Sequence, residues 1–310
     1  AGRNENDDSA EWYSFEDGHN YSMTHYEDLR FLSMMPNLLF LHMANVEIDP
    51  EMMPDLSKSN RLQWIQICDS NIGSLEWLRG ATMGGFTLTA TDVESYAPLS
   101  DCTNLSRLQL DLGYSETADF TGCSTAMIQE LEINNGWNLR GELDLSWISN
   151  CRYLQMCSLR GGLPITDISF LSEIGTLKKL YLTDLRELND ISALRNVLNL
   201  TELEIRSCPQ VADYSPIEGC FDLRNLTIEC WENQYALTDA SFLSGMNWLS
   251  SLSLEGAALQ NLDFLNDSGS NTARITLSLF GNIQDYSGLK AKDTYDSLEI
   301  GAYAEYDSPD

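Results

Sequence analysis

Short runs of alternating apolar and polar residues recur along most of the chain. In each run two apolar residues stand two positions apart, and one run follows the next after 21 to 26 residues. Such alternation is typical of a β-strand that buries one of its faces. The inward-facing pairs of the twelve predicted strands are Leu41/Met43, Ile65/Ile67, Phe86/Leu88, Leu108/Leu110, Leu131/Ile133, Cys157/Leu159, Leu180/Leu182, Leu203/Ile205, Leu226/Ile228, Leu252/Leu254, Leu277/Leu279 and Leu298/Ile300.

Two neighbouring repeats between Ile165 and Ile205 are nearly copies of each other. In the first, Leu177, Leu180 and Leu182 form a Leu-x-x-Leu-x-Leu pattern that Leu200, Leu203 and Ile205 repeat in the second. Each copy is preceded by Asp-Ile-Ser-x-Leu. This combination resembles the internalin-type class of leucine-rich repeat, a short unit found in bacterial proteins.

The resemblance implies an α/β fold: a right-handed leucine-rich-repeat solenoid, or horseshoe, with a parallel concave β-sheet and convex 3₁₀ turns and loops. Such an array grows as one body because each unit contacts only its neighbours. We therefore expect an N-terminal capping segment with a degenerate repeat (1–37), an array of about twelve units (38–303) and an acidic C-terminal tail (304–310). In the first segment, Thr24-x-x-Glu27 fits a capping box that opens a short helix through Met35, with a purely local turn as the alternative.

A second register accompanies the first. An aspartate or serine stands about ten residues before the first apolar strand position of most units. Short oxygen-bearing side chains accept hydrogen bonds from free N–H groups where a helical turn begins. We therefore expect these residues to cap the return turns rather than to bind metal: Asp28, Ser74, Ser95, Asp119, Asp144, Asp167, Asp190, Asp213, Asp239 and Asp285.

The slot directly after each strand departs from the repeat class. An asparagine there normally satisfies buried backbone groups between coils, but this chain has one only at Asn282. Other units have Val46, Ser70, Thr91, Leu185 and Cys208 at that slot. This loss leaves the conformation of the loops, and therefore the curvature, open.

The charge balance argues against two classes of partner. The chain has 18 Lys and Arg against 47 Asp and Glu, a net charge of −29. Nucleic acids and anionic membranes attract basic surfaces, so we expect neither nucleic-acid binding nor membrane insertion. The most apolar window, Phe31–Met43, is too short to span a bilayer. No signal peptide is visible, and a start at Ala1 rather than Met favours a processed, exported protein.

The eight cysteines fit a packed core better than a disulfide framework. Five of them replace apolar residues of the repeat, and free cysteine behaves as a small buried hydrophobe. We expect Cys102, Cys123, Cys151, Cys157 and Cys220 to be buried thiols. The pair Cys208 and Cys230, in adjacent units, stays open as a bridge, and Cys68 is expected on the concave face.

No motif points to catalysis. There is no Cys-x-x-Cys, no phosphate-binding glycine loop and no Gly-x-Ser-x-Gly. Glu130 with Glu132, or Glu202 with Glu204, resembles a glycosidase pair in spacing, but an open sheet offers no deep pocket. We expect no enzyme activity, no metal site and no cofactor.

The outward-facing strand positions supply the candidate binding residues. One patch is aromatic and lies near the N-terminal end of the array, and a second patch of mixed charge lies at mid-array; between them stands Arg107. The candidates are Phe40, His42, Trp64, Gln66, Arg107, Arg160, Lys179, Tyr181, Glu202, Glu204 and Arg206. Against binding, the terminal segment would cover the aromatic patch, and the charges of the second patch would pair with one another, as Lys179 with Glu202 and Arg206 with Glu229.

We therefore interpret the chain as a non-enzymatic module that recognises a protein or glycoprotein through its concave face. By the resemblance, it would be a monomer that is secreted or displayed on a bacterial surface. The alternative is a cytoplasmic scaffold or regulatory subunit, which unpaired cysteines favour.

Overall fold

A computed structural model describes most of the chain. The described residues are 12–14, 20–22, 24–91, 93, 95–112, 117–123, 125–135, 139, 143–231, 237–267, 274–280, 285, 287–291 and 296–303. The tail predicted at 304–310, Asn282 and most of the first 23 residues lie outside them.

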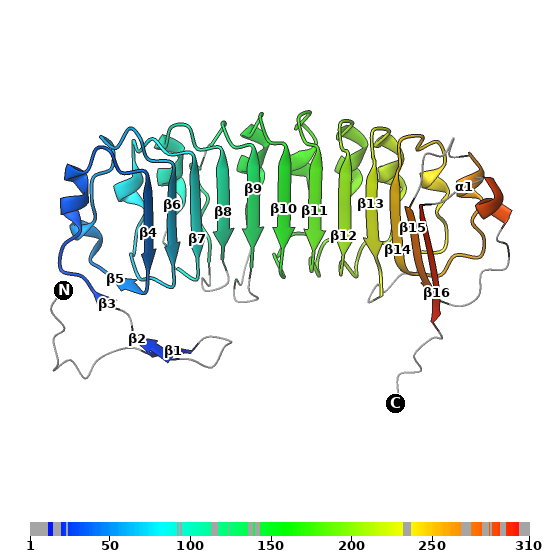
Figure 1. Ribbon diagram of the computed structural model, residues 1–310, viewed down its shortest axis with the longest axis horizontal. Helices are drawn as coiled ribbons and strands as arrows, with labels where there is room; N and C mark the ends of the chain where they lie inside the picture. Colours follow the sequence, from blue (N-terminus) through cyan, green and yellow to red (C-terminus); the bar gives the residue numbers. More distant parts are fainter. Residues whose placement is uncertain are drawn as a thin grey trace.

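Twelve parallel strands form one sheet that runs the length of the molecule, with consecutive strands side by side (Figure 1). All twelve strands expected from the sequence are present. Their bounds are β4 (Phe40–Ala44), β6 (Trp64–Cys68), β7 (Gly85–Thr89), β8 (Arg107–Asp111), β9 (Glu130–Asn134), β10 (Met156–Arg160), β11 (Lys179–Thr183), β12 (Glu202–Arg206), β13 (Asn225–Glu229), β14 (Ser251–Ala257), β15 (Arg274–Phe280) and β16 (Ser297–Tyr303).

Short 3₁₀ turns lie behind the sheet and return the chain to the next strand (Figure 1). This arrangement is a leucine-rich-repeat solenoid, as the sequence predicts. The turns are η1 (Arg30–Met34), η2 (Pro50–Met52), η3 (Glu76–Leu78), η4 (Ala97–Asp101), η5 (Ser146–Asn150), η6 (Ser169–Leu171), η7 (Ser192–Asn196), η8 (Ser215–Gly219), η9 (Ser241–Leu243) and η10 (Ser287–Ala291), with one α-helical turn, α1 (Phe264–Asp267).

One continuous core fills the space between the sheet and the turns. The inward-facing residues of the central strands, such as Leu180, Leu182 and Ile205, are fully buried. Each coil therefore depends on its neighbours for burial, because one coil has too little apolar surface to fold alone.

The register of β15 differs from the expectation. Leu252 and Leu254 of β14 lie beside Ile275 and Leu277, and these two lie beside Leu298 and Ile300 of β16. Leu277 and Leu279 are both buried as expected, but the pair in register with Leu252 and Leu254 is Ile275 and Leu277, two residues earlier. A bulge between Glu255 and Ala257 lets Ala257 pair with Leu279. The strand β15 therefore has three inward-facing apolar residues, Ile275, Leu277 and Leu279. Gly256 permits this bulge, because its φ of 75° suits glycine.

The N-terminal segment also differs from the expectation. Thr24 and His25 form β3, which pairs in parallel with β5 (Val46–Glu47), so no helix begins at the capping box. The helical turn η1 begins only at Arg30, whose N–H donates to Asp28. Before it, β1 (Trp12–Ser14) and β2 (Asn20–Ser22) form an antiparallel pair.

All ten expected capping residues accept a hydrogen bond from the backbone N–H two positions later. At Asp190, for example, the Ser192 N–H lies 2.7 Å from the carboxylate. The other bonds are 2.7 to 3.2 Å long and involve Asp28, Ser74, Ser95, Asp119, Asp144, Asp167, Asp213, Asp239 and Asp285. These bonds lower the pKa of the Asp144 and Asp190 carboxyls, because they favour the charged form.

Short polar side chains connect the coils where the asparagine ladder is missing. The Val46 N–H donates to the Ser70 hydroxyl (3.2 Å), and the Ser70 N–H donates to the Thr91 hydroxyl (3.3 Å). Farther along, the buried Asn135 donates its amide to the Gly162 carbonyl (3.0 Å). Asn135 stands one position before the slot at which the repeat normally has its asparagine, so the repeat pattern did not predict its role.

None of the eight cysteines is joined to another in the structure, which leaves Cys208 and Cys230 unbridged. Cys123, Cys151, Cys157 and Cys220 are buried as expected, whereas Cys102 is half-buried. Burial raises the pKa of the Cys151 thiol to about 11 and that of Cys220 to about 12. Such thiols stay protonated near neutral pH and therefore react slowly.

A capping aspartate is expected to contribute measurably to stability. Asp190→Ala should lower the free energy of unfolding by about 1 kcal/mol, because the Ser192 N–H loses its acceptor. Asp190→Asn keeps an oxygen in place and should cost clearly less. Urea unfolding of both variants measures the difference; equal losses would contradict the capping role.

The thiols are expected to be free but protected. Under denaturing, non-reducing conditions a thiol reagent should label all eight cysteines. The prediction of a thiol core requires at least five labelled groups. In the native protein at pH 8 the buried thiols should label slowly, and the rate should keep rising with pH up to about 11, the pKa of Cys151. Two or fewer labelled groups after denaturation would show that the core cysteines are bridged.

Candidate functional site

The outward-facing residues of the sheet form a surface that we call the concave face. Paired strands keep corresponding residues adjacent, so Phe40 lies beside Trp64, and Lys179 lies beside Glu202. All candidate residues from the sequence occupy outward-facing strand positions. The register of β15 adds Arg274, which lies beside Ser251 on this face.

The aromatic patch at the N-terminal end is open to solvent. The Phe40 side chain is 63% exposed, and His42 is exposed as well. The described residues of the terminal segment therefore leave Phe40 uncovered. Trp64 and Gln66 are half-buried. The Gln66 amide lies 3.5 Å from the Cys68 sulfur, so Cys68 lies on the concave face, as expected.

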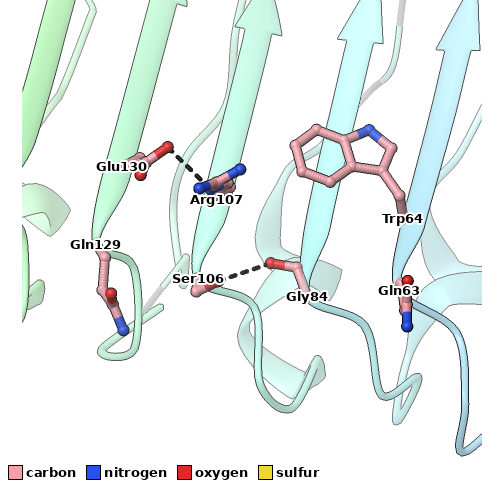
Figure 2. Close-up of a pocket in the computed structure, with 7 residues that line it drawn as sticks. All are labelled: Gln63, Trp64, Gly84, Ser106, Arg107, Gln129 and Glu130. Carbon is pink, nitrogen blue, oxygen red and sulfur yellow. Dashed lines mark hydrogen bonds and ion pairs between the residues drawn. The ribbon is translucent and has the colours of Figure 1, made fainter.

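The Trp64 indole extends from β6 over the neighbouring strand β7 (Figure 2). It covers Gly85, where an added Cβ would overlap the indole ring. Glycine at this position is what allows the ring to lie across the sheet. The sequence held one signal of this arrangement: Gly85 stands where most other coils have a large or polar side chain.

A shallow hollow of about 290 Å³ lies beside the ring. Its lining residues come from four adjacent coils and are Gln63, Trp64, Gly84, Ser106, Arg107, Gln129 and Glu130 (Figure 2). On its far side the Arg107 guanidinium lies 2.9 Å from the Glu130 carboxylate. Both side chains are substantially exposed, so this ion pair is worth little and can exchange for a ligand.

The mid-array patch pairs with itself. The Lys179 ammonium lies 3.1 Å from Glu202, and the Tyr181 hydroxyl donates to the same carboxylate at 2.8 Å. Burial, together with this bond to Glu202, raises the pKa of Tyr181 above its usual range. Arg160 donates to the Ser158 hydroxyl at 2.8 Å.

Arg206 is the centre of a charge cluster at the end of this patch. Its guanidinium lies 2.9 Å from both Glu204 and Glu229, and 3.9 Å from Glu255. Partial burial opposes the charge of Arg206, but the bonds to Glu229 and Glu204 outweigh it and raise its pKa. One cation thus holds three carboxylates together, as the sequence predicted for the pair with Glu229.

The chemistry of this face suits recognition. Its functional groups are aromatic rings, amides, hydroxyls and ion pairs on an open surface. Across the described part of the chain, no group of three His, Cys, Asp or Glu residues is arranged to hold a metal ion. Nor does any helix within that part have the length and apolar character needed to cross a membrane.

Comparisons with known structures place the chain among leucine-rich-repeat solenoids. An internalin, InlF of Listeria monocytogenes, superposes with a TM-score of 0.65 at 21% identity, over 91% of this chain and 78% of that one. The functional domain of InlJ from the same organism, which includes a cysteine ladder, gives 0.53 at 15% identity, over 83% of this chain and 52% of that one.

The plant peptide hormone receptor RGFR1, in complex with RGF2, gives a TM-score of 0.50 at 15% identity, over 90% of this chain and 46% of that one. No protein-family model matches the sequence. A search among curated proteins finds no match either. At these identities the likeness establishes the fold alone.

The Arg206 cluster predicts a specific electrostatic contribution. Arg206→Gln should lower the free energy of unfolding by about 1 kcal/mol, because three neighbouring carboxylates then repel one another. Part of the loss should return in 1 M salt, which screens that repulsion. Arg160→Gln is the matched control and should change stability little; an equal loss in both variants would contradict the cluster's role.

Proposed function

We propose that this protein is a non-enzymatic recognition module that binds a protein, or a glycan carried by one, through the N-terminal half of its concave face. One observation carries the proposal: the Trp64 ring lies across Gly85 and forms the edge of a hollow that Arg107 and Glu130 complete. Aromatic and arginine side chains at the centre of an open surface are the usual anchors of protein interfaces.

The contrast with the mid-array patch supports this choice. There, Lys179, Tyr181 and Glu202 already satisfy one another, and a ligand would have to break these bonds. At the N-terminal end, Phe40 is 63% exposed. Burying such a ring stabilises a complex by about 2 kcal/mol or more.

A rigid sheet favours binding for an entropic reason. The backbone of each strand is hydrogen-bonded to its neighbours, so little conformational entropy is lost when a ligand binds. The plant receptor with the same fold was solved in complex with RGF2, which is consistent with a protein ligand here. The mixed polar and aromatic lining of the hollow also suits a sugar, whose apolar face would lie on the Trp64 ring.

The setting we propose is secretion or display on a bacterial surface, which the two internalin likenesses favour. The second candidate is a cytoplasmic scaffold, favoured by eight cysteines that form no bridge. The codons upstream of Ala1 distinguish the two settings, because an exported protein needs a signal peptide.

The test begins with capture of ligands from a panel of cell-surface proteins and from a glycan array. For any ligand found, Trp64→Ala should weaken binding at least about tenfold. Gly85→Ala should weaken it too, because the new methyl group displaces the ring while leaving it in the chain. Glu187→Ala, an exposed change after β11 and away from the concave face, should have no effect. If Glu187→Ala weakens binding and both concave changes leave it intact, the proposal is wrong.

A further inference from the structure

The strands of the sheet begin at one edge of the solenoid, the upper edge in Figure 1. Exposed apolar side chains lie in the turns that precede these strands. A two-residue turn precedes each of the six strands from β9 to β14, and in five of these six coils the turn has a large apolar residue. These residues, which we call the apolar rim, are Met127 (49% exposed), Tyr153 (55%), Leu198 (54%), Phe221 (60%) and Trp248 (58%). The sixth turn is Gly175 and Thr176.

The fold itself does not require apolar residues at these positions. The structural bonds of the turns come from their polar members: Thr176 donates to the Arg152 carbonyl (3.1 Å) and Asn199 donates to the Gly175 carbonyl (2.6 Å). The corresponding turns before β4, β6 and β8 contain Asn37, Arg61 and Asn104 instead. Large apolar side chains in five of six successive turns are costly in water unless a partner covers them.

The charges beside the apolar rim differ from those of the chain as a whole. On the side toward the concave face, the residue before each strand is Gln129, Gln155, Lys178, Thr201, Arg224 or Ser250, a set without carboxylates. On the opposite side stand Glu173, Arg195 and Glu218. The rim is therefore nearly balanced in charge within a strongly acidic protein, which permits two copies to meet there.

We propose that the apolar rim joins two copies of this chain into a two-fold symmetric dimer, in place of the monomer expected from the sequence. The first argument is spacing: the rim residues repeat at the separation of the coils, about 4.8 Å at the sheet. A second copy matches this separation along the whole row. A two-fold axis through the concave and convex faces runs the two rows in opposite directions and keeps both concave faces on one side.

The second argument is complementarity under that axis. With its centre between the β11 and β12 coils, the axis sets Leu198 against the small turn of the partner's Gly175, and Tyr153 against the partner's Phe221. Arg152 then faces the partner's Asp222, and Glu173 faces the partner's Arg195. Thus opposite charges meet, and a protruding side chain meets the one turn that lacks one.

The first experiment measures mass in solution by sedimentation equilibrium. The wild type should give twice the 34.8 kDa of one chain at micromolar concentrations. Phe221→Asp should raise the dimer dissociation constant at least about tenfold, because the charge would be buried in the interface. Met34→Asp is the matched control: Met34 is 79% exposed but lies outside the rim, so the dimer should persist.

The second experiment tests the symmetry by charge reversal. Arg152→Asp alone and Asp222→Arg alone should each weaken the dimer, since like charges then face each other. The double variant should restore it. Arg152 and Asp222 lie three coils apart within one chain, so a rescue reports contact between chains.

Two results would overturn the proposal. One is a wild type that stays monomeric at 100 µM, which would leave the rim to a different protein. The other is a dimer that neither Phe221→Asp nor the charge reversals affect. Circular dichroism of each variant checks that the fold is kept. The rim lies apart from Trp64, so a failed dimer leaves the proposed concave-face function untouched.

Discussion

The structure depends on the translation of one coil onto the next. Each coil contributes one strand and a few apolar residues, and it buries them only because the next coil closes over them. The same translation aligns the backbone groups of adjacent strands, so the sheet hydrogen bonds and the core form together. A change in one coil is therefore felt mainly by its two neighbours.

The acidic composition follows partly from this constraint. Every return turn begins with free N–H groups, and aspartate is the residue that accepts from them most often here. Other carboxylates, such as Glu202 and Glu229, balance the cations of neighbouring strands. Many of the acidic residues thus have structural partners, and they are poor indicators of what the protein binds.

Both proposed surfaces use the repeat but break it locally. On the concave face, Gly85 interrupts a column of side chains and lets Trp64 lie across the gap. Along the rim, Gly175 interrupts a row of apolar residues and leaves room opposite Leu198. A dimer through the rim would place two concave faces on one side, where a ligand with two epitopes would bind through both and gain avidity.

The sequence by itself determined the architecture. Apolar pairs at a nearly constant period define the strands, and the aspartates ten residues earlier define the turns, because both patterns follow from local geometry that every coil repeats. It also indicated which residues face outward, since alternation is a property of a single strand.

Tertiary structure decided the rest. The two-residue shift in β15 depends on a bulge against β14 that no single strand reveals. The position of the Trp64 ring depends on a glycine in the next coil, and the exposure of the rim turns depends on how six coils stack. Each of these features is a contact between neighbouring coils. The pattern of residues along the sequence does not give the distance between side chains of different coils.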